Sequence, residues 1–475
     1  MASYIPSIGM EVHAELATRS KMFCRCEVAF GGEPNTRTCP ICLGLPGTLP
    51  VPNRRAIEMV IRTALALNCK IAMRSVFHRK NYFYPDLPKG YQVTQYGETN
   101  PLGYQGYLDI GTKRIRIRRV HLEEDTGKLM HLGTGESGVD YNRAGTPLME
   151  IVTDYPPDIE NEEEAKEYLV QLRQILLYLG VCDGKMEEGS LRCEPNVSVR
   201  LAGSDELGTK TELKNLNSFR SVQMGSAYEI KRQVAILEEG GKVQQETRGW
   251  NEQQEASYLM RVKEEENDYR YFPDPDLIPM CFDEAYIESL RAGLPELPLA
   301  KQRRYREQLG LGEYEAGWIT TDVEWVAFFE EALAGGGEAK AITNWMTSDL
   351  SKLLNGAGIS VGQSKVSPGH LVDLVRLQEN GTISGKMAKA LLGDVFNTGK
   401  MPSELVEEQG ASQINDEATI RVVVAEVLGE NEETVAKFKG GNLGSRGFLV
   451  GLVLKKTQGR ANPQLVQKIV GEALE

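Results

Sequence analysis

The sequence predicts an α+β protein in which a mixed or antiparallel sheet domain is followed by helices. Short segments that alternate polar and apolar residues recur up to about residue 290, as half-buried strands do. One helical pattern interrupts them at residues 161–180, where Asn161 can cap the helix and Gly180 can end it. After the proline-containing segment 294–298, apolar residues recur at helical spacing to the end of the chain.

Acidic residues and histidines share one face of several predicted strands. Glu11 and His13 alternate with apolar residues near the N-terminus, so both side chains point the same way. His121 and Glu123 follow the same rule. Glu124 faces the opposite side of a regular strand, so either a bulge is present or only one of the two glutamates joins the cluster.

A further cluster is predicted in a hairpin formed by residues 192–200 and 210–214. Lys210, Glu212 and Lys214 recur at every second position and therefore share one face. Such a face is either a solvated surface with cross-strand ion pairs or a binding site for a phosphate-bearing ligand and its metal ion. The second interpretation is favoured because Glu150, in front of an apolar pair, adds another acid with strand-like spacing.

Carboxylates without thiolates favour hard cations, and a site with few protein ligands suits Mg²⁺ that carries nucleotide phosphates. A histidine beside acids is more often structural than a ligand. The chain has only five histidines, however, and two of them occur in these acidic segments.

Four cysteines predict a separate metal site. Cys24 and Cys26 form a CxC motif, and Cys39 and Cys42 form a CxxC motif twelve residues further on. This spacing is typical of a closed, tetrahedral, structural Zn²⁺ site. The alternative is a set of buried or reactive thiols.

The composition narrows the class of protein. The chain has 475 residues, a net charge of −13 and a pI of about 5.2, which argues against broad non-specific binding to nucleic acid. It shows no apolar run long enough to span a membrane and no export signal, so a cytoplasmic location is expected.

The C-terminal helices are polarised in charge. Residues 404–433 hold nine acids and one arginine, whereas residues 437–468 hold seven basic residues and no acid. Charge runs are usually solvated faces, but this one lies among glycines that would allow close approach to a phosphate backbone. The candidate nucleic-acid contacts are Lys437, Lys439, Arg446, Lys455, Lys456 and Arg460.

Seven ordered segments together resemble the B subunits of tRNA-dependent amidotransferases (GatB). These segments are residues 8–13, 80–86, 121–127, 140–150, 186–193, 208–219 and 265–275. The resemblance is collinear over the whole chain. It implies a catalytic cradle domain at residues 1–293, a helical domain at 294–400 and a YqeY-like tRNA-binding tail at 401–475.

The resemblance also implies an activity: ATP phosphorylates the side-chain carboxylate of Glu-tRNA(Gln) or Asp-tRNA(Asn), and ammonia then displaces the phosphate to give Gln-tRNA or Asn-tRNA. The implied Mg²⁺ ligands are Glu11, His13, Glu123, Glu124, Glu150 and Glu212. The implied phosphate contacts are Lys80, Arg143, Lys210 and Lys214. The residues with implied catalytic roles are Glu11, His13, Lys80, Glu124 and Glu150.

The resemblance implies a heterotrimer in which ammonia comes from a partner glutaminase of the amidase type, the A chain, and a small third protein, the C chain, clasps both. We find no amidase signature in the present chain itself. Two alternatives stay open: a non-catalytic tRNA-binding scaffold of the same complex, and a metal-dependent kinase or phosphoesterase that acts on small molecules.

Overall fold

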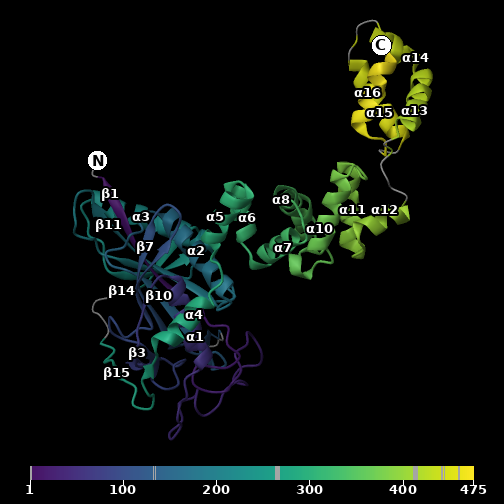
Figure 1. The fold of residues 1–475 in the computed structure, drawn as a ribbon. Coiled ribbons are helices and arrows are strands. Elements are labelled where there is room, and N and C mark those ends of the chain that lie inside the picture. The colour runs from purple at the N-terminus through teal and green to yellow at the C-terminus, as the bar shows by residue number, and fades with distance from the viewer. Residues whose placement is uncertain are drawn as a thin grey trace. The chain divides into compact units, whose positions relative to one another are not determined.

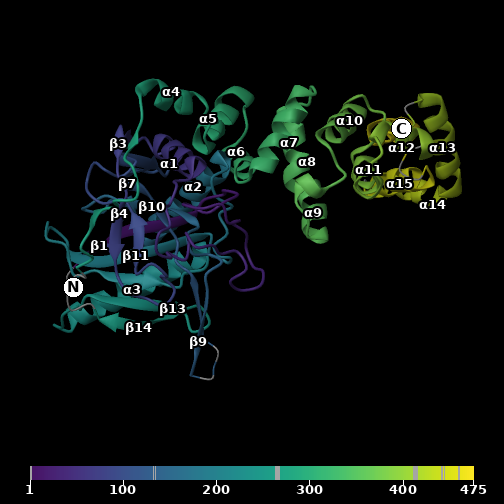
Figure 2. The same cartoon turned by 90° about the horizontal axis from the view of Figure 1, so that it is seen from below.

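The computed structural model describes residues 3–131, 133, 135–262, 268–409, 414, 416–439, 442, 444–457 and 460–474. The chain divides into two compact units, Met1–Leu299 and Ala300–Glu475 (Figure 1, Figure 2). The first unit combines a large sheet with helices, and the described elements of the second unit are helical. The predicted α+β class is therefore confirmed.

A nine-stranded sheet forms the centre of the first unit. Neighbouring strands run antiparallel, except β12 and β13, which are parallel. The spatial order of the strands is β14 (Ala256–Val262), β13 (Glu246–Asn251), β12 (Thr211–Lys214), β11 (Leu191–Leu201), β1 (Tyr4–Glu15), β10 (Pro147–Thr153), β7 (Arg114–Glu124), β6 (Gly103–Asp109) and β2 (Lys70–Ile71).

Three small sheets surround this large one. The first consists of β15 (Phe272–Pro273), β4 (His78–Asn81) and β5 (Tyr91–Thr94). The second pairs β16 (Met280–Cys281) with β3 (Arg74–Ser75), and the third is the hairpin of β8 (Lys128–His131) and β9 (Ser137–Asp140).

Helices cover one face of the large sheet and leave the other face to polar side chains. The helices are α1 (Arg54–Ala66), α2 (Glu162–Leu179), α3 (Phe219–Glu238) and α4 (Glu284–Ala292). In β1, Met10, Val12 and Ala14 belong to the same buried core as Tyr168 and Leu172 of α2. The residues between them point to the opposite face, because side chains alternate along a strand.

Helix α2 begins and ends where the sequence predicts. The side chain of Asn161 accepts a hydrogen bond from the backbone N–H of Glu164 at 2.8 Å, and Gly180 ends the helix with a φ of 63°. Three glutamates in the first turn favour the positive end of the helix dipole.

A β-bulge in β7 decides which of its side chains face the polar side. Arg119 pairs with Val152 and Ile117 pairs with Thr153, so Arg118 is an extra residue in this strand. Even-numbered Val120 and Leu122 beyond the bulge therefore enter the core, as odd-numbered Ile115 and Ile117 do before it. Odd-numbered residues after the bulge face the polar side.

The second unit contains helices α5 to α16 and two short helical turns. These are α5 (Pro298–Leu309), α6 (Glu313–Thr320), α7 (Val323–Ala334), α8 (Ala339–Trp345), η1 (Met346–Leu350), α9 (Ser351–Ala357), η2 (Val361–Gln363), α10 (Pro368–Glu379), α11 (Gly385–Thr398), α12 (Pro402–Gln409), α13 (Glu417–Glu430), α14 (Glu432–Lys439), α15 (Gly444–Lys456) and α16 (Pro463–Leu474). None of the helices among the described residues is long and apolar enough to cross a membrane.

The last four helices have a hydrophobic core of their own. Ile420 and Val424 of α13 pack with Leu449 of α15 and with Val466 and Ile469 of α16. Helix α12 lies against α10 and α11 instead. The predicted boundary near residue 400 stays a prediction.

Candidate functional site

A cavity of about 810 Å³ lies on the polar face of the large sheet. It is bounded by the strands from β12 to β7 and, beyond β7, by residues of the small β15–β4–β5 sheet. Of the residues proposed from the sequence for metal or phosphate binding, those that line this cavity are Glu11, His13, Lys80, Glu123, Glu150, Lys210, Glu212 and Lys214.

Strand register builds the centre of the cavity. His13 of β1 pairs with Arg192 of β11 on one side and with Glu150 of β10 on the other. Glu150 in turn pairs with His121 of β7. We call these four residues the central row. Directly paired residues lie about 5 Å apart, so the row alternates base and acid across four strands within interaction distance.

Three side chains in and beside the central row form a candidate metal site. The Nε2 atom of His13 lies 3.6 Å from Glu123 Oε1 and 3.7 Å from Glu150 Oε2. One ligand atom from each of the three residues lies within 4.8 Å of the others. Two carboxylates and one imidazole, open to a cavity, suit a hard cation that keeps positions for water or phosphate oxygen.

His121 holds Glu150 in place from the far side. Its Nε2 atom lies 2.9 Å from Glu150 Oε2, and 3.7 Å from Glu123 Oε2. Burial alone would lower the pKa of His121, but the charge of Glu150 and hydrogen bonds to both glutamates outweigh burial and raise this pKa to about 9. Despite its burial, the pKa of Glu150 is lowered by His121. The pair is therefore an imidazolium and a carboxylate at neutral pH.

Glu11 lies one row further along β1. Its Oε1 atom accepts a hydrogen bond from the side-chain amide of Asn196 at 3.0 Å. Burial, followed by the nearby charge of Glu150, raises the pKa of Glu11. A carboxyl group of this kind gains from a cation, because the cation offsets both the burial and the repulsion.

The β11–β12 side of the cavity is basic and acidic in turn. Lys214 Nζ lies 2.7 Å from Glu194 Oε2 and 3.2 Å from Glu212 Oε1. Glu212 also accepts a hydrogen bond from the hydroxyl group of Thr247 at 2.9 Å. Lys210 precedes β12 and is exposed, so its ammonium group reaches the cavity from the solvent side.

Lys80 enters the cavity from the small β15–β4–β5 sheet. Its Nζ atom lies 4.7 Å from the ring centroid of Tyr269 and 5.7 Å from that of Tyr82. Burial would lower the pKa of Lys80, but Glu123 and neighbouring groups outweigh it and raise the pKa. The side chain therefore brings a fixed positive charge to the acidic cluster.

The structure separates Glu124 from this cluster. Because Glu123 faces the cavity, Glu124 faces the other side of β7, where it pairs with Lys89 and accepts a hydrogen bond from the Val93 backbone N–H at 3.0 Å. There it lines a second cavity, of about 210 Å³, together with Cys24 and other residues of the cysteine-containing loops.

Arg143 also lies apart from the residues that line the large cavity. Its guanidinium group donates to the backbone carbonyls of Thr126 and Gly127 at 3.1 and 2.8 Å and lies 3.5 Å from Asp125. These contacts fix the loop that follows β7, so Arg143 supports the wall of the cavity and does not reach into it.

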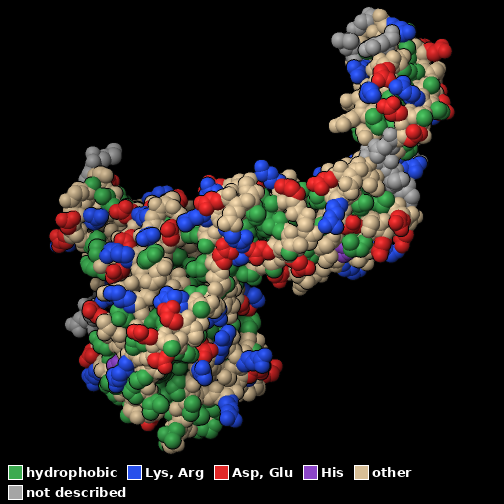
Figure 3. All heavy atoms as spheres, viewed as in Figure 1, with side chains coloured by type: hydrophobic (Ala, Val, Ile, Leu, Met, Phe, Trp, Pro, Cys, Tyr) green, Lys and Arg blue, Asp and Glu red, His purple; other side chains and the backbone are tan. Residues whose placement is uncertain are grey.

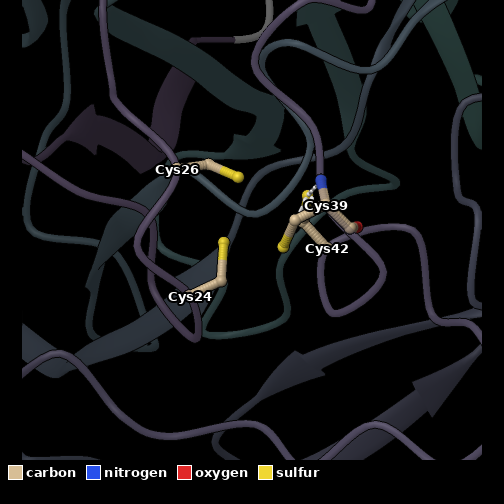
Figure 4. Close-up of side chains that lie close together, drawn as sticks. All are labelled: Cys24, Cys26, Cys39 and Cys42. Carbon is tan, nitrogen blue, oxygen red and sulfur yellow. Dashed lines mark hydrogen bonds between the residues drawn. The ribbon is translucent and has the colours of Figure 1, made fainter.

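The four cysteines of the CxC and CxxC motifs converge on one point (Figure 4). Their sulfur atoms all lie within 4.8 Å of one another, and those of Cys39 and Cys42 lie 3.9 Å apart. Tetrahedral zinc with bonds of about 2.3 Å needs sulfur atoms about 3.8 Å apart, so the arrangement fits this metal. A hydrogen bond from Cys24 is the largest of the effects that lower the pKa of Cys42 to about 5.

Buried Lys21 adds a positive charge beside this cluster. Its Nζ atom lies 3.7 Å from Cys42 Sγ and donates a hydrogen bond to the backbone carbonyl of Tyr141 at 3.1 Å. Four thiolates around Zn²⁺ carry a net charge of −2, which a buried cation would offset in part. The sequence contains no pattern that singles out this lysine.

The candidate tail residues are all exposed, but their charges are not all free. Lys456 lies 3.0 Å from Glu426 and 2.7 Å from Glu430, and Arg446 donates to the backbone carbonyl of Gln467 at 3.0 Å. Acidic and basic side chains both appear on the visible face of this bundle (Figure 3). The expected basic run is therefore partly neutralised by the acidic run that precedes it.

Several cavity residues were not proposed from the sequence as site residues. They include Arg119, His121, Arg192, Glu194 and Asn196. Alternation could have indicated each of them, since all recur at period two with residues that were proposed. What alternation does not give is which strands are neighbours, and this information joins His121 to Glu150.

The first half of the chain matches the family model described as the GatB/GatE catalytic domain, over residues 6–288. Residues 327–474 match the model described as the GatB domain. The segment 265–275, which contributed to the resemblance, begins with three residues that lie outside the described part of the structure.

Curated proteins similar to this chain are named as the B subunit of aspartyl/glutamyl-tRNA(Asn/Gln) amidotransferase. The protein from Brevibacillus brevis is 50% identical over 100% of this chain and 99% of its own length. Those from Caldanaerobacter subterraneus and Moorella thermoacetica are 51% and 52% identical over 99% of this chain, and over 99% and 100% of their own lengths.

We expect the Glu150→Gln substitution to lower the pKa of His121, because it removes the carboxylate that most stabilises the imidazolium while burial still disfavours that charge. NMR titration of the histidine side chains in metal-free protein measures this pKa, which should fall below its wild-type value of about 9. An unchanged pKa would contradict the ion pair. Glu163→Gln, on the exposed side of α2, is the matched control.

Proposed function

The chain belongs to the GatB/GatE family, and from this membership together with the cavity we propose that it amidates misacylated Glu-tRNA(Gln), Asp-tRNA(Asn) or both. The γ-phosphoryl group of ATP passes to the side-chain carboxylate of the tRNA-borne residue, and ADP leaves. Ammonia then attacks the carbonyl carbon of this acyl phosphate, the C–O bond breaks, and inorganic phosphate leaves with formation of the amide. A bare carboxylate has no comparable leaving group.

The observation that carries this proposal is the central row of Arg192, His13, Glu150 and His121, with Glu123 beside it, in a cavity that also contains lysines. Phosphoryl transfer requires mainly positioning and electrostatic stabilisation of charged oxygens. Metal-holding carboxylates next to fixed cations meet this requirement.

We assign the roles as follows. His13, Glu123 and Glu150 hold Mg²⁺, with Glu11 and Glu212 at neighbouring positions on the same face. When bound, the metal ion neutralises phosphoryl charge. The lysines that contact phosphate oxygens in this proposal are Lys80, Lys210 and Lys214.

His121 positions the Glu150 carboxylate and keeps it ionised in this scheme. Glu124 and Arg143 are left out of the proposed set, because their side chains are engaged elsewhere, with Lys89 and with the carbonyls of Thr126 and Gly127.

We propose that ammonia comes from glutamine through a partner glutaminase, and that a small third protein completes a heterotrimer. The curated relatives are named as one subunit of a larger enzyme, which supports a multi-subunit assembly. So does the exposure of Phe30, Leu45, Leu49 and Val51 in the loops around the cysteines. Figure 3 shows hydrophobic side chains gathered at the lower end of this unit. The reaction belongs to the carbon–nitrogen ligases with glutamine as amido donor, and the proposed location is the cytoplasm.

The activity of the assembled complex tests the proposed chemistry. With Glu-tRNA(Gln), Mg²⁺, ATP and free ammonium but no glutamine, the wild type should release ADP and form Gln-tRNA. Glu150→Gln should slow both at least about 100-fold, because it removes a metal-holding charge and the partner of His121. Glu163→Gln, on α2 behind the sheet, should keep wild-type rates.

Equal rates in Glu150→Gln and wild type would contradict the catalytic assignment and favour the alternative, a non-catalytic tRNA-binding scaffold. ADP release without Gln-tRNA formation in the wild type would instead show a kinase that does not complete amidation. The zinc content and thermal transition of each variant show whether it is folded.

We propose that Cys24, Cys26, Cys39 and Cys42 hold one structural Zn²⁺. The loops they join contain no helix and little strand, so the metal would replace the hydrophobic core that these loops lack. We expect the purified protein to contain about one zinc per chain by atomic absorption, and Cys24→Ser to lower this content and the thermal transition temperature of the protein. Cys281→Ser, an exposed cysteine outside the cluster, should change neither.

We propose that the tail binds the tRNA backbone through exposed Lys437, Lys439, Arg446, Lys455, Lys456 and Arg460. Lys456 is a poor choice for mutation, because its reversal would also disrupt contacts with Glu426 and Glu430. Lys437→Glu combined with Lys455→Glu should weaken tRNA binding about tenfold in low salt and reduce its salt dependence.

Filter binding of tRNA over a range of salt concentrations measures both effects. Lys242→Glu, an exposed lysine of the first unit, is the matched control. An unchanged dissociation constant and salt slope in the double variant would contradict the proposed role of the tail.

A further inference from the structure

We infer that the exposed ring of Tyr96, supported from behind by Tyr271, is a stacking site for an adenine base at the rim of the large cavity. The inference rests on the proposed function, because both proposed substrates carry adenosine: ATP itself, and the tRNA in its terminal nucleotide. The structure assigns the chemistry of the ligand, and the experiment below separates its two sources.

The Tyr96 and Tyr271 rings are stacked, with centroids 4.1 Å apart and an angle of 10° between their planes. The Tyr96 residue is nevertheless 54% exposed. Because Tyr271 covers one face of the ring, the exposed area belongs to the other face and to the edge. A flat base can therefore continue the stack without displacing a protein ring.

Neighbouring aromatic residues hold this pair in place. Tyr271 meets the ring of Tyr269 edge to face at 5.9 Å, and Tyr269 meets Tyr82 in the same way at 6.0 Å. His78 lies against Tyr96 edge to face at 6.1 Å. The four tyrosines line the large cavity, so together they form one wall of it. A preformed stacking surface loses little conformational entropy when a base binds.

The wall adjoins the candidate metal site. Thr94, two residues before Tyr96, donates a hydrogen bond to Glu123 Oε2 at 3.3 Å. Gln95 accepts a hydrogen bond from the backbone N–H of Leu122 at 3.0 Å. A chain rises about 3.3 Å per residue in extended conformation, so the backbone of Tyr96 lies about 7 Å beyond that of Thr94. A base on Tyr96 would therefore lie roughly one nucleotide from the acidic cluster.

Arginines at the same cavity supply charge for the phosphate and ribose that a base brings with it. The bulge in β7 places Arg118 as an extra residue next to Arg119, and both line the cavity. Arg119 lies 3.8 Å from Glu150, whereas Arg118 is exposed. Aromatic rings beside cations are the usual combination for single-stranded nucleotides.

The test uses the full complex and four forms of this chain: wild type, Tyr96→Ala, Tyr96→Phe and Tyr84→Ala. Tyr84 is an exposed tyrosine of the same region that is not among the residues lining the cavity, so it controls for the loss of a surface ring. KM for ATP is measured at saturating Glu-tRNA(Gln), and KM for Glu-tRNA(Gln) at saturating ATP.

We expect Tyr96→Ala to raise one of these two KM values about 5- to 100-fold, the range that the loss of one base stack produces. An increase in KM for ATP identifies the adenine of ATP as the ligand, and an increase in KM for the tRNA identifies its terminal adenosine. Tyr96→Phe keeps the ring and should stay within about twofold of wild type, as should Tyr84→Ala.

Two outcomes would overturn the inference: both KM values unchanged in Tyr96→Ala, or a Tyr96→Phe variant as impaired as Tyr96→Ala, which would assign the effect to the hydroxyl group. If the wild type does not amidate the tRNA, the proposed function fails and equilibrium binding replaces kinetics. Binding of labelled ATP and of deacylated tRNA to wild type and Tyr96→Ala then decides between stacking and no stacking in the same way.

Discussion

The ion pair between Glu150 and His121 holds the centre of the sheet together. Glu150 is a carboxylate with little exposure, and an unpaired charge in such a place costs several kcal/mol, about 3–5 when one partner of a buried pair is removed. The imidazoles of His13 and His121 flank it on the two neighbouring strands. The polar face can therefore be acidic and still be folded. The same imidazoles hold the carboxylate where a cation and a phosphate can reach it.

This arrangement depends on the opposite face of the same strands. Met10, Val12 and Ala14 of β1 pack in the core with helix α2, which fixes both the tilt of the strand and its register. A slip by one residue would exchange core and cavity side chains. The bulge at Arg118 has a comparable effect within β7, because it directs Glu123 to the large cavity and Glu124 to the smaller cavity near the cysteines. Two adjacent glutamates thus serve two different environments.

Much of the first unit could be predicted from alternation and spacing. The strand segments, the capped helix at 161–180 and the convergence of four cysteines follow from local patterns, and the structure contains all three. The start of helix α7 was less well predicted. The sequence around Thr321 resembles a capping box, but Asp322 is the cap and accepts a hydrogen bond from Glu324 N–H at 2.8 Å. Two overlapping candidates one residue apart cannot be separated by propensity alone.

The sequence by itself determined which side chains share a face, because the period of a strand is two residues regardless of what surrounds it. It also determined the metal-binding character of the cysteine loops and the family to which the chain belongs. Only the tertiary structure decided that β1 lies between β10 and β11, and hence that His13 meets Glu150. It alone separated Glu124 and Arg143 from the large cavity and placed Tyr96 against Tyr271. The physical reason is that strand order and bulges arise from the packing of segments distant in the chain, which no local pattern records.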